Sequence, residues 1–157
     1  MRLCEHLAAC SVRAFLWLRS LLMTAARPAR LRQLILIEDD DALRRSLQLL
    51  LTGRDYEVLA FSRAEAAIEF PAALSAPLLI TDYVLPRCNG VEALRLLREK
   101  GWSGRALLMT AFDTQRLRDL ALKMGFDAVL PKPFRTTDLI EFLGDRPAGH
   151  DAELAPA

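Results

Sequence analysis

The chain has 157 residues and a formal net charge of +1. This length suits one domain with a proper hydrophobic core, and the balanced charge gives no global indication of nucleic-acid binding. Cys4, Cys10 and Cys88 have neither the spacing of a zinc site nor the pattern of a secreted disulfide scaffold, which favours a cytoplasmic protein in a reducing compartment.

Residues 1–30 differ in composition from the rest of the chain, since Leu, Ala and Arg dominate them. Arg13 and Arg19 interrupt the apolar stretch, so it is too short to span a bilayer. Three interpretations stay open: an amphipathic helix at a membrane surface, a poor signal peptide, or an extension outside the functional domain. We favour the third, with Met23 as an alternative start and no membrane partner.

Leu34–Ile37 is a short apolar run that is followed by acids, from Glu38 to Asp41. Leucines then recur at helical spacing on one face. Asp40 or Asp41 can cap this helix, and Gly53 can end it. The stretch therefore predicts a strand, an acid cluster and a helix.

Two further strand and helix units come next in the chain. Tyr56–Phe61 predicts a second strand, and residues 62–65 (Ser-Arg-Ala-Glu) match a capping box that opens a short helix. Leu78–Asp82 predicts a third strand, because a continuous apolar run is typical of a strand buried on both faces in a parallel sheet. Asn89-Gly90 then turns the chain into a helix that begins near Val91.

The last units complete the alternation. Ala106–Met109 predicts a fourth strand, and Thr114–Met124 an amphipathic helix. Ala128–Leu130 predicts a fifth strand, and Thr136 can cap a last helix. Residues 145–157 are rich in Pro, Ala and charge, so we expect a disordered tail there. Five alternating units predict an α/β fold with a parallel sheet covered by helices on both faces.

Polar side chains follow four of the five predicted strands: Glu38 and Asp39, then Asp82, Thr110 and Lys132. In open α/β folds the carboxyl ends of the strands share one edge, so we expect these side chains to meet. Crowded carboxylates repel one another, and a hard cation such as Mg²⁺ relieves that repulsion. Lys132 and Thr110 suit phosphate oxygens, and carboxylates are known phosphoryl nucleophiles. The pattern predicts phosphoryl transfer to Asp82.

With these motifs the chain resembles the receiver domain of two-component response regulators over residues 31–143. The motifs that carry the resemblance are Glu38-Asp39, Asp82 with Pro86 and Asn89-Gly90, Thr110-Ala111, and Lys132-Pro133-Phe134. It implies a flavodoxin-like, doubly wound sheet of five parallel strands, (βα)5, in the order 2-1-3-4-5. It also implies a receiver domain over residues 31–144 and a cis peptide bond before Pro133.

The resemblance implies a metal site and a phosphoacceptor. Asp82 is the expected phosphoacceptor, and Asp39 and Asp82 are expected to bind Mg²⁺ directly. Glu38 is expected to act near the metal through water, and the backbone carbonyl of Val84 completes the metal ligands.

The resemblance also implies the partners. The expected phosphodonor is a sensor histidine kinase or a histidine phosphotransfer protein, and Thr110 and Lys132 assist the transfer. The protein is then no enzyme beyond catalysing its own phosphorylation and dephosphorylation. Output is expected through residues 114–143, by binding a downstream protein, by phosphorylation-dependent homodimer formation or by phosphorelay.

Two positions depart from the family's pattern, and two others are expected to set the rate at which the phosphorylated Asp82 hydrolyses. Val129 stands where an aromatic side chain commonly moves with the switch hydroxyl, and Cys88 stands where Met is frequent. Val84 and Phe112 flank the approach of water to the phosphoacceptor, and neither can orient a water, so we expect slow hydrolysis. Because little chain follows the receiver, we expect a stand-alone receiver.

Three other functions compete. A phosphatase of the haloacid dehalogenase type requires a second Asp where Val84 stands. A flavodoxin-like nucleotide binder requires a phosphate loop after the first strand, where acids would repel phosphate. A degenerate receiver that acts without phosphate would lack Asp82, Asp39 or Lys132, and all three are present.

Overall fold

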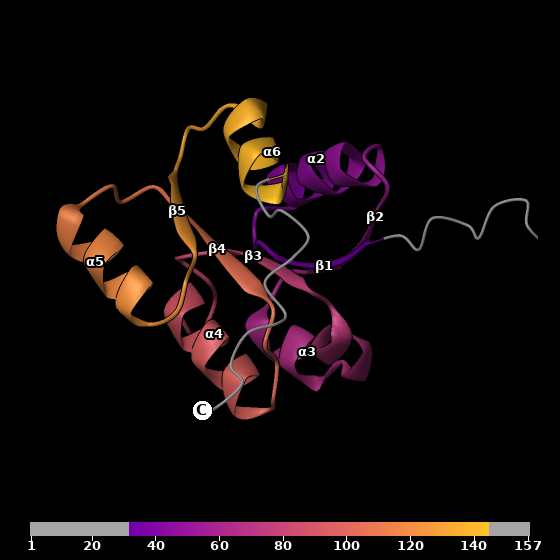
Figure 1. Cartoon of the computed structure of the whole chain (residues 1–157), viewed down its shortest axis with the longest axis horizontal. Helices are drawn as coiled ribbons and strands as arrows, with labels where there is room; N and C mark the ends of the chain where they lie inside the picture. Colours follow the sequence, from indigo (N-terminus) through magenta and orange to yellow (C-terminus); the bar gives the residue numbers. More distant parts are fainter. Residues whose placement is uncertain (1–31, 145–157) are drawn as a thin grey trace, which may run out of the picture. The chain divides into compact units, whose positions relative to one another are not determined.

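The computed structural model describes residues 32–144. The predicted extension over residues 1–30 and the predicted tail over residues 145–157 lie outside the described residues. Figure 1 shows the described part as a sheet between two layers of helices.

Five strands form one parallel sheet in the order β2-β1-β3-β4-β5, which confirms the predicted fold class and strand order. The strands are β1 (Arg32–Ile37), β2 (Tyr56–Phe61), β3 (Leu78–Asp82), β4 (Arg105–Thr110) and β5 (Ala128–Pro131). Every residue of the central strand β3 is buried, as are the last four residues of β1. The continuous apolar runs therefore form the interior strands, as expected for a sheet covered on both faces.

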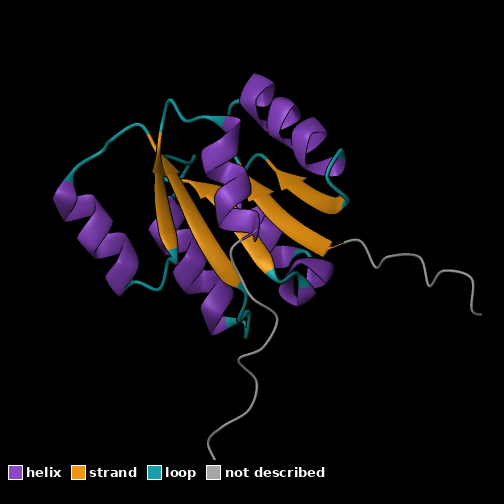
Figure 2. Cartoon of the chain, turned by 45° about the horizontal axis from the view of Figure 1, so that its top comes forward, coloured by secondary structure: helices purple, strands orange, loops and turns teal. Residues whose placement is uncertain are grey.

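Helices cover both faces of the sheet, as Figures 1 and 2 show. The helices are α2 (Asp41–Thr52), α3 (Ala64–Glu69), α4 (Gly90–Glu99), α5 (Gln115–Lys123) and α6 (Thr136–Gly144), with a 3₁₀ helix, η1 (Pro71–Ser75), after α3. α2 and α6 lie on one face, and α3, α4 and α5 on the other. Within residues 32–144, no helix combines the length and the apolar character that crossing a membrane requires.

Two hydrophobic clusters result from this arrangement. Ile35 and Ile37 of β1 pack with the α3, α4 and α5 side, whereas Leu34 and Leu36 pack with the α2 and α6 side. Successive side chains of a strand point to opposite faces, so an unbroken apolar run supplies both clusters at once.

Three helix starts follow their sequence signals. Asp40 caps α2, and its carboxylate accepts a hydrogen bond from the Leu43 amide at 2.7 Å. The side chains of Asn89 and Thr114 cap α4 and α5 in the same way. Short polar side chains accept the free amides of a first turn, so these boundaries could be predicted locally.

The predicted capping box over residues 62–65 is wrong. α3 begins at Ala64 after Arg63, whose side chain makes no capping hydrogen bond. Ser62 therefore lies one position before the cap, and the spacing between the cap and the third helical residue that a capping box needs is lost.

Candidate functional site

The strand register places the predicted polar residues at one edge of the sheet. Asp82, at the end of β3, pairs with Met109 of β4, and Thr110 pairs with Pro131 of β5. Glu38 directly follows β1, which is the neighbour of β3 on its other side. The ends of these strands therefore lie along one edge of the sheet, although their positions in the sequence are far apart.

Three carboxylates form a cluster at this edge. One carboxylate oxygen from each of Glu38, Asp39 and Asp82 lies within 4.8 Å of the other two. Glu38 and Asp82 are only 1% and 8% exposed, whereas Asp39 is exposed. Adjacent buried carboxylates destabilise each other's charged form unless a positive charge lies between them. The acid cluster therefore requires a compensating cation.

Lys132 supplies one positive charge to the acid cluster. Its ammonium donates to Glu38 Oε2 at 2.8 Å and lies 3.1 Å from Asp82 Oδ1. Burial lowers the pKa of Lys132, but the hydrogen bond and charge of Glu38, with the charge of Asp82, outweigh burial and raise it. Burial raises the pKa of Glu38 even though Lys132 opposes that rise. The peptide bond between Lys132 and Pro133 is cis, as the family resemblance implies.

The donor set fits a hard divalent cation. Mg²⁺ prefers oxygen ligands and is usually held by one or two carboxylates together with waters. Glu38, Asp39 and Asp82 supply carboxylate oxygens at a suitable mutual distance, and the exposed Asp39 leaves the cluster open to solvent. One ammonium offsets only part of three negative charges, so a bound cation would stabilise their ionised forms.

The two oxygens of Asp82 differ in their contacts. Oδ1 accepts from the backbone N–H of Tyr83 at 2.8 Å and also faces Lys132. Within residues 32–144, every hydrogen bond to this carboxylate goes to Oδ1. The lone pairs of Oδ2 are therefore available to a cation or to an electrophile.

Thr110 and Val84 lie near the acid cluster in different ways. Thr110 is fully buried, and its hydroxyl oxygen accepts from the Phe112 amide at 2.9 Å. The hydroxyl is thus bonded to the loop after β4 rather than to the acids. Val84 lies in the loop between β3 and α4, where it forms an isolated bridge with Asn89 and is 51% exposed.

Gly90 has a role that the sequence did not indicate. A Cβ at this position would lie 2.3 Å from the carbonyl oxygen of Asp82 and 2.8 Å from Leu108 Cδ1. Only glycine lets α4 begin this close to the end of β3. Asn89-Gly90 signalled a turn, but the sequence could not show which backbone lies beside it.

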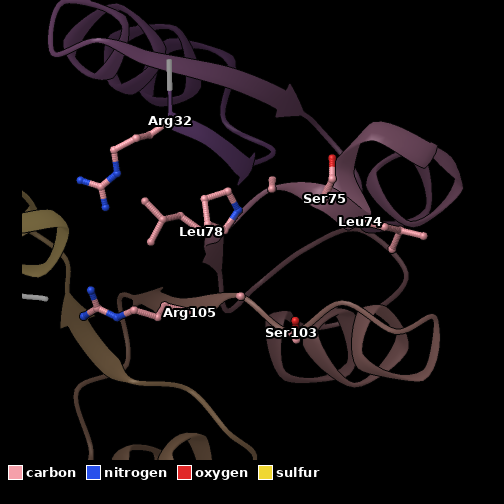
Figure 3. A pocket seen from close by; sticks show the side chains of 9 residues that line it. Arg32, Leu74, Ser75, Leu78, Ser103 and Arg105 are labelled. Carbon is pink, nitrogen blue, oxygen red and sulfur yellow. The ribbon is translucent and has the colours of Figure 1, made fainter. Parts of the chain in front are cut away.

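A hollow of about 350 Å³ opens where the strands begin, at the edge opposite the acid cluster (Figure 3). Arg32 and Arg105, the first residues of β1 and β4, line it together with Ser75 and Ser103. Each guanidinium stacks over an aromatic ring. The residues that line this hollow include no acid, so they resemble neither a metal site nor a phosphoacceptor.

Comparison with known proteins agrees with the geometry. A model of the response regulator receiver domain family matches residues 34–143. The response regulator MprA of Mycobacterium leprae is 33% identical over 108 residues, which are 69% of this chain and 47% of MprA. MprA of Mycobacterium ulcerans is equally similar, with the same coverage. The chain thus spans about half the length of these curated relatives.

Solved structures agree as well. The BeF3-activated N-terminal receiver domain of Klebsiella pneumoniae RstA has a TM-score of 0.65 and 27% identity, covering 71% of this chain and 94% of that one. A CheY-like receiver domain protein from Methanospirillum hungatei has a TM-score of 0.63 and 26% identity, covering 72% and 90%. Chemotaxis protein CheY4 of Vibrio cholerae, at 19% identity, shares the fold with a TM-score of 0.67 and coverage of 72% and 96%.

The family match covers most of the chain, and the strand order is the predicted one. The acid cluster is consistent with a phosphorylation site. The chain belongs to the response regulator receiver domain family.

Proposed function

We propose that this chain accepts a phosphoryl group on Asp82 and then signals through phosphorylation-dependent binding or phosphorelay. The observation that carries the proposal is the meeting of Asp82 with Glu38, Asp39 and Lys132 at one edge of the sheet. Family membership implies a cognate histidine kinase. The phosphodonor in this proposal is a phosphohistidine of such a kinase or of a phosphotransfer protein.

Asp82 is the nucleophile in this proposal. Its Oδ2 forms the new O–P bond while the P–N bond to the donor imidazole breaks and the electron pair returns to the ring. Lys132, already beside Oδ1, holds a phosphoryl oxygen, and the Thr110 hydroxyl leaves the Phe112 amide to donate to another. Transfer of this kind depends mainly on positioning and charge neutralisation. Mg²⁺, when bound, neutralises charge between the carboxylates and the phosphoryl oxygens.

The three carboxylates have different roles in the proposed metal site. Asp39 and Asp82 would bind Mg²⁺ directly, and the backbone carbonyl of Val84 would be a further ligand. Glu38 would act through water, because both of its carboxylate oxygens already accept contacts, Oε2 from Lys132 and Oε1 from the Asp40 amide. The exposed Asp39 carboxylate supports its direct role.

The proposed output surface consists of α5, β5 and α6. Thr110 contacts both loops that lead there, since its hydroxyl accepts from Phe112 and its carbonyl accepts from the Lys132 amide at 2.6 Å. Movement of Thr110 toward a phosphoryl group changes both contacts. The local charge of the phosphoryl group would thereby shift the equilibrium between two conformations of the output surface. Val129 packs against the hydrophobic cluster of the α3, α4 and α5 side. With no aromatic ring at that position, the backbone after Thr110 carries more of the change toward a downstream protein or a second copy of the chain.

Two competing functions are disfavoured by particular residues. A phosphatase of the haloacid dehalogenase type needs an acid where the apolar, half-exposed Val84 lies. A degenerate receiver does not require the contact between Lys132 and Asp82, whose side chains are largely buried. Desolvating an ion pair costs folding free energy, so its presence favours a functional role. We therefore propose a signalling module that acts on no substrate beyond its own phosphoryl group.

The proposed aspartyl phosphate should hydrolyse slowly. Val84 and Phe112, two residues after Asp82 and Thr110, are 51% and 56% exposed. The Phe112 ring packs edge-on against Tyr83, with 6.4 Å between the ring centres. Neither apolar side chain can orient an attacking water, and orientation is a large part of the rate.

Intact-mass measurement with acetyl phosphate tests the phosphoacceptor. Wild type should gain one phosphoryl group in the presence of Mg²⁺ and none with EDTA, and Asp82→Asn should gain none. Asp119→Asn, which changes an exposed carboxylate on α5, is the matched control and should behave like wild type. Equal phosphate incorporation in wild type and Asp82→Asn would rule out the assignment.

A further inference from the structure

Arg44 of α2 reaches back over the acid loop, residues 38–40. Its Nη1 donates to the carbonyl oxygens of Glu38 at 2.8 Å and Asp39 at 3.3 Å, and its Nη2 pairs with Asp41. The Arg44 side chain is only 17% exposed. We propose that Arg44 is a positioning residue that fixes the acid loop, and through it the Asp39 carboxylate, in the arrangement that binds Mg²⁺. This inference rests on the proposed metal site.

Other contacts fix Glu38 but not the carbonyls of the acid loop. The Glu38 amide donates to Phe61 of β2 at 3.1 Å, and its carboxylate contacts Lys132 and the Asp40 amide. The carbonyls of Glu38 and Asp39 accept side-chain hydrogen bonds from Arg44 alone within residues 32–144. Arg44 therefore holds the carbonyl side of both peptide planes that flank Asp39, while the N–H of the second plane has a long contact of 3.4 Å to Glu38 Oε1.

Helix stability does not by itself explain Arg44, although its pair with Asp41 supports the first turn of α2. A cation in the first turns of a helix opposes the positive end of the helix dipole. Long side chains in helices point toward the N-terminus, which brings the guanidinium to the acid loop. The hydrogen bonds to the carbonyls of Glu38 and Asp39 offset the unfavourable interaction with the helix dipole. These two residues precede α2, so the hydrogen bonds stabilise the acid loop rather than the helix.

Losing the charge of Arg44 and losing its contacts to the acid loop should change Mg²⁺ affinity in opposite directions. A measured affinity can therefore distinguish the two roles. A guanidinium near a cation site repels Mg²⁺, so removing its charge alone would tighten binding. Removing a group that orients metal ligands typically weakens affinity, by roughly 10–100-fold. Lost charge therefore cannot explain a weaker Mg²⁺ affinity in Arg44→Gln, whereas lost positioning explains it.

Calorimetric titration with MgCl₂, without any phosphodonor, tests this on the full chain. Arg44→Gln should bind Mg²⁺ at least about ten-fold more weakly than wild type. Arg45→Gln makes the same change of charge one residue later on an exposed side chain and should bind like wild type. Arg44→Lys should recover part of the affinity, because one ammonium can reach one carbonyl.

Amide NMR of the metal-free protein gives a second readout. Signals of Asp39 and Asp40 should shift in Arg44→Gln and stay in place in Arg45→Gln. Unchanged signals, equal weakening by both variants, or Mg²⁺ binding by Arg44→Gln as tight as wild type would each overturn the inference. Wild type that binds no Mg²⁺ would refute the proposed metal site instead, and the NMR comparison would then decide the role of Arg44 in the acid loop by itself.

Discussion

Replacing Lys132 by Met tests the charge balance of the acid cluster. Met has a similar shape but no charge, so the buried Glu38 and Asp82 lose the cation they share. Removing one partner of a buried ion pair costs about 3–5 kcal/mol. Glu38 keeps a long contact to the Asp40 amide at 3.4 Å, so we expect the lower end, about 3 kcal/mol, near pH 8 without Mg²⁺. That is a large share of the roughly 5–15 kcal/mol by which native domains are typically stable.

The loss of stability should depend on pH. Burial raises the pKa of Glu38, so its contribution to stability is fully present below the unfolded-state value near 4.5 and is lost as pH rises through the raised folded value. Lys132 opposes this rise, so its removal should move the folded value further upward. Lys132 itself has a raised pKa, so its own contribution is constant until pH exceeds its unfolded value of 10.5. Lys132→Met should therefore approach wild-type stability as pH falls from about 8 to about 5.

Urea unfolding followed by far-UV circular dichroism, with EDTA present, measures this. Lys123→Met, at the exposed end of α5, is the control and should stay within about 0.5 kcal/mol of wild type. Adding Glu38→Gln to Lys132→Met should restore part of the loss near pH 8, because one of the two buried carboxylates is gone. A loss that does not vary with pH, or one that Lys123→Met reproduces, would refute the reasoning.

Three further outcomes are expected. Phe112→Glu and Val84→Asn should each shorten the lifetime of the phosphorylated protein, because a polar side chain can hold the attacking water; unchanged decay would contradict the argument. A chain that starts at Met23 should fold and accept phosphate at the wild-type rate, because residues 1–30 differ in composition from the predicted domain. An insoluble or inert product would place the extension within the domain. Beryllofluoride should shift amide signals across residues 117–143, and shifts confined to the loop after Asp82 would contradict the proposed output surface.

Short-range signals account for the features that the sequence could predict. The apolar runs of β1 and β3 indicated buried strands, since a strand covered on both faces needs apolar side chains on both. Asp40 indicated the start of α2, because a cap acts on amides a few residues away. The alternation of units then implied the sheet, and the chemistry of the strand ends implied a phosphoacceptor at Asp82 with acids and a lysine around it.

The contacts between distant residues required the tertiary structure. Glu38 and Lys132 are separated by 94 positions, and only the side-chain packing shows that they meet at 2.8 Å. The same packing explains why residue 90 must be glycine and why Arg44 reaches the acid loop. By itself the sequence determined which groups end the strands, because hydrophobic periodicity and capping are local. The tertiary structure alone decided which of those groups touch, which carboxylate oxygen stays free and which pKa values shift, because these depend on burial and distance across the sheet edge.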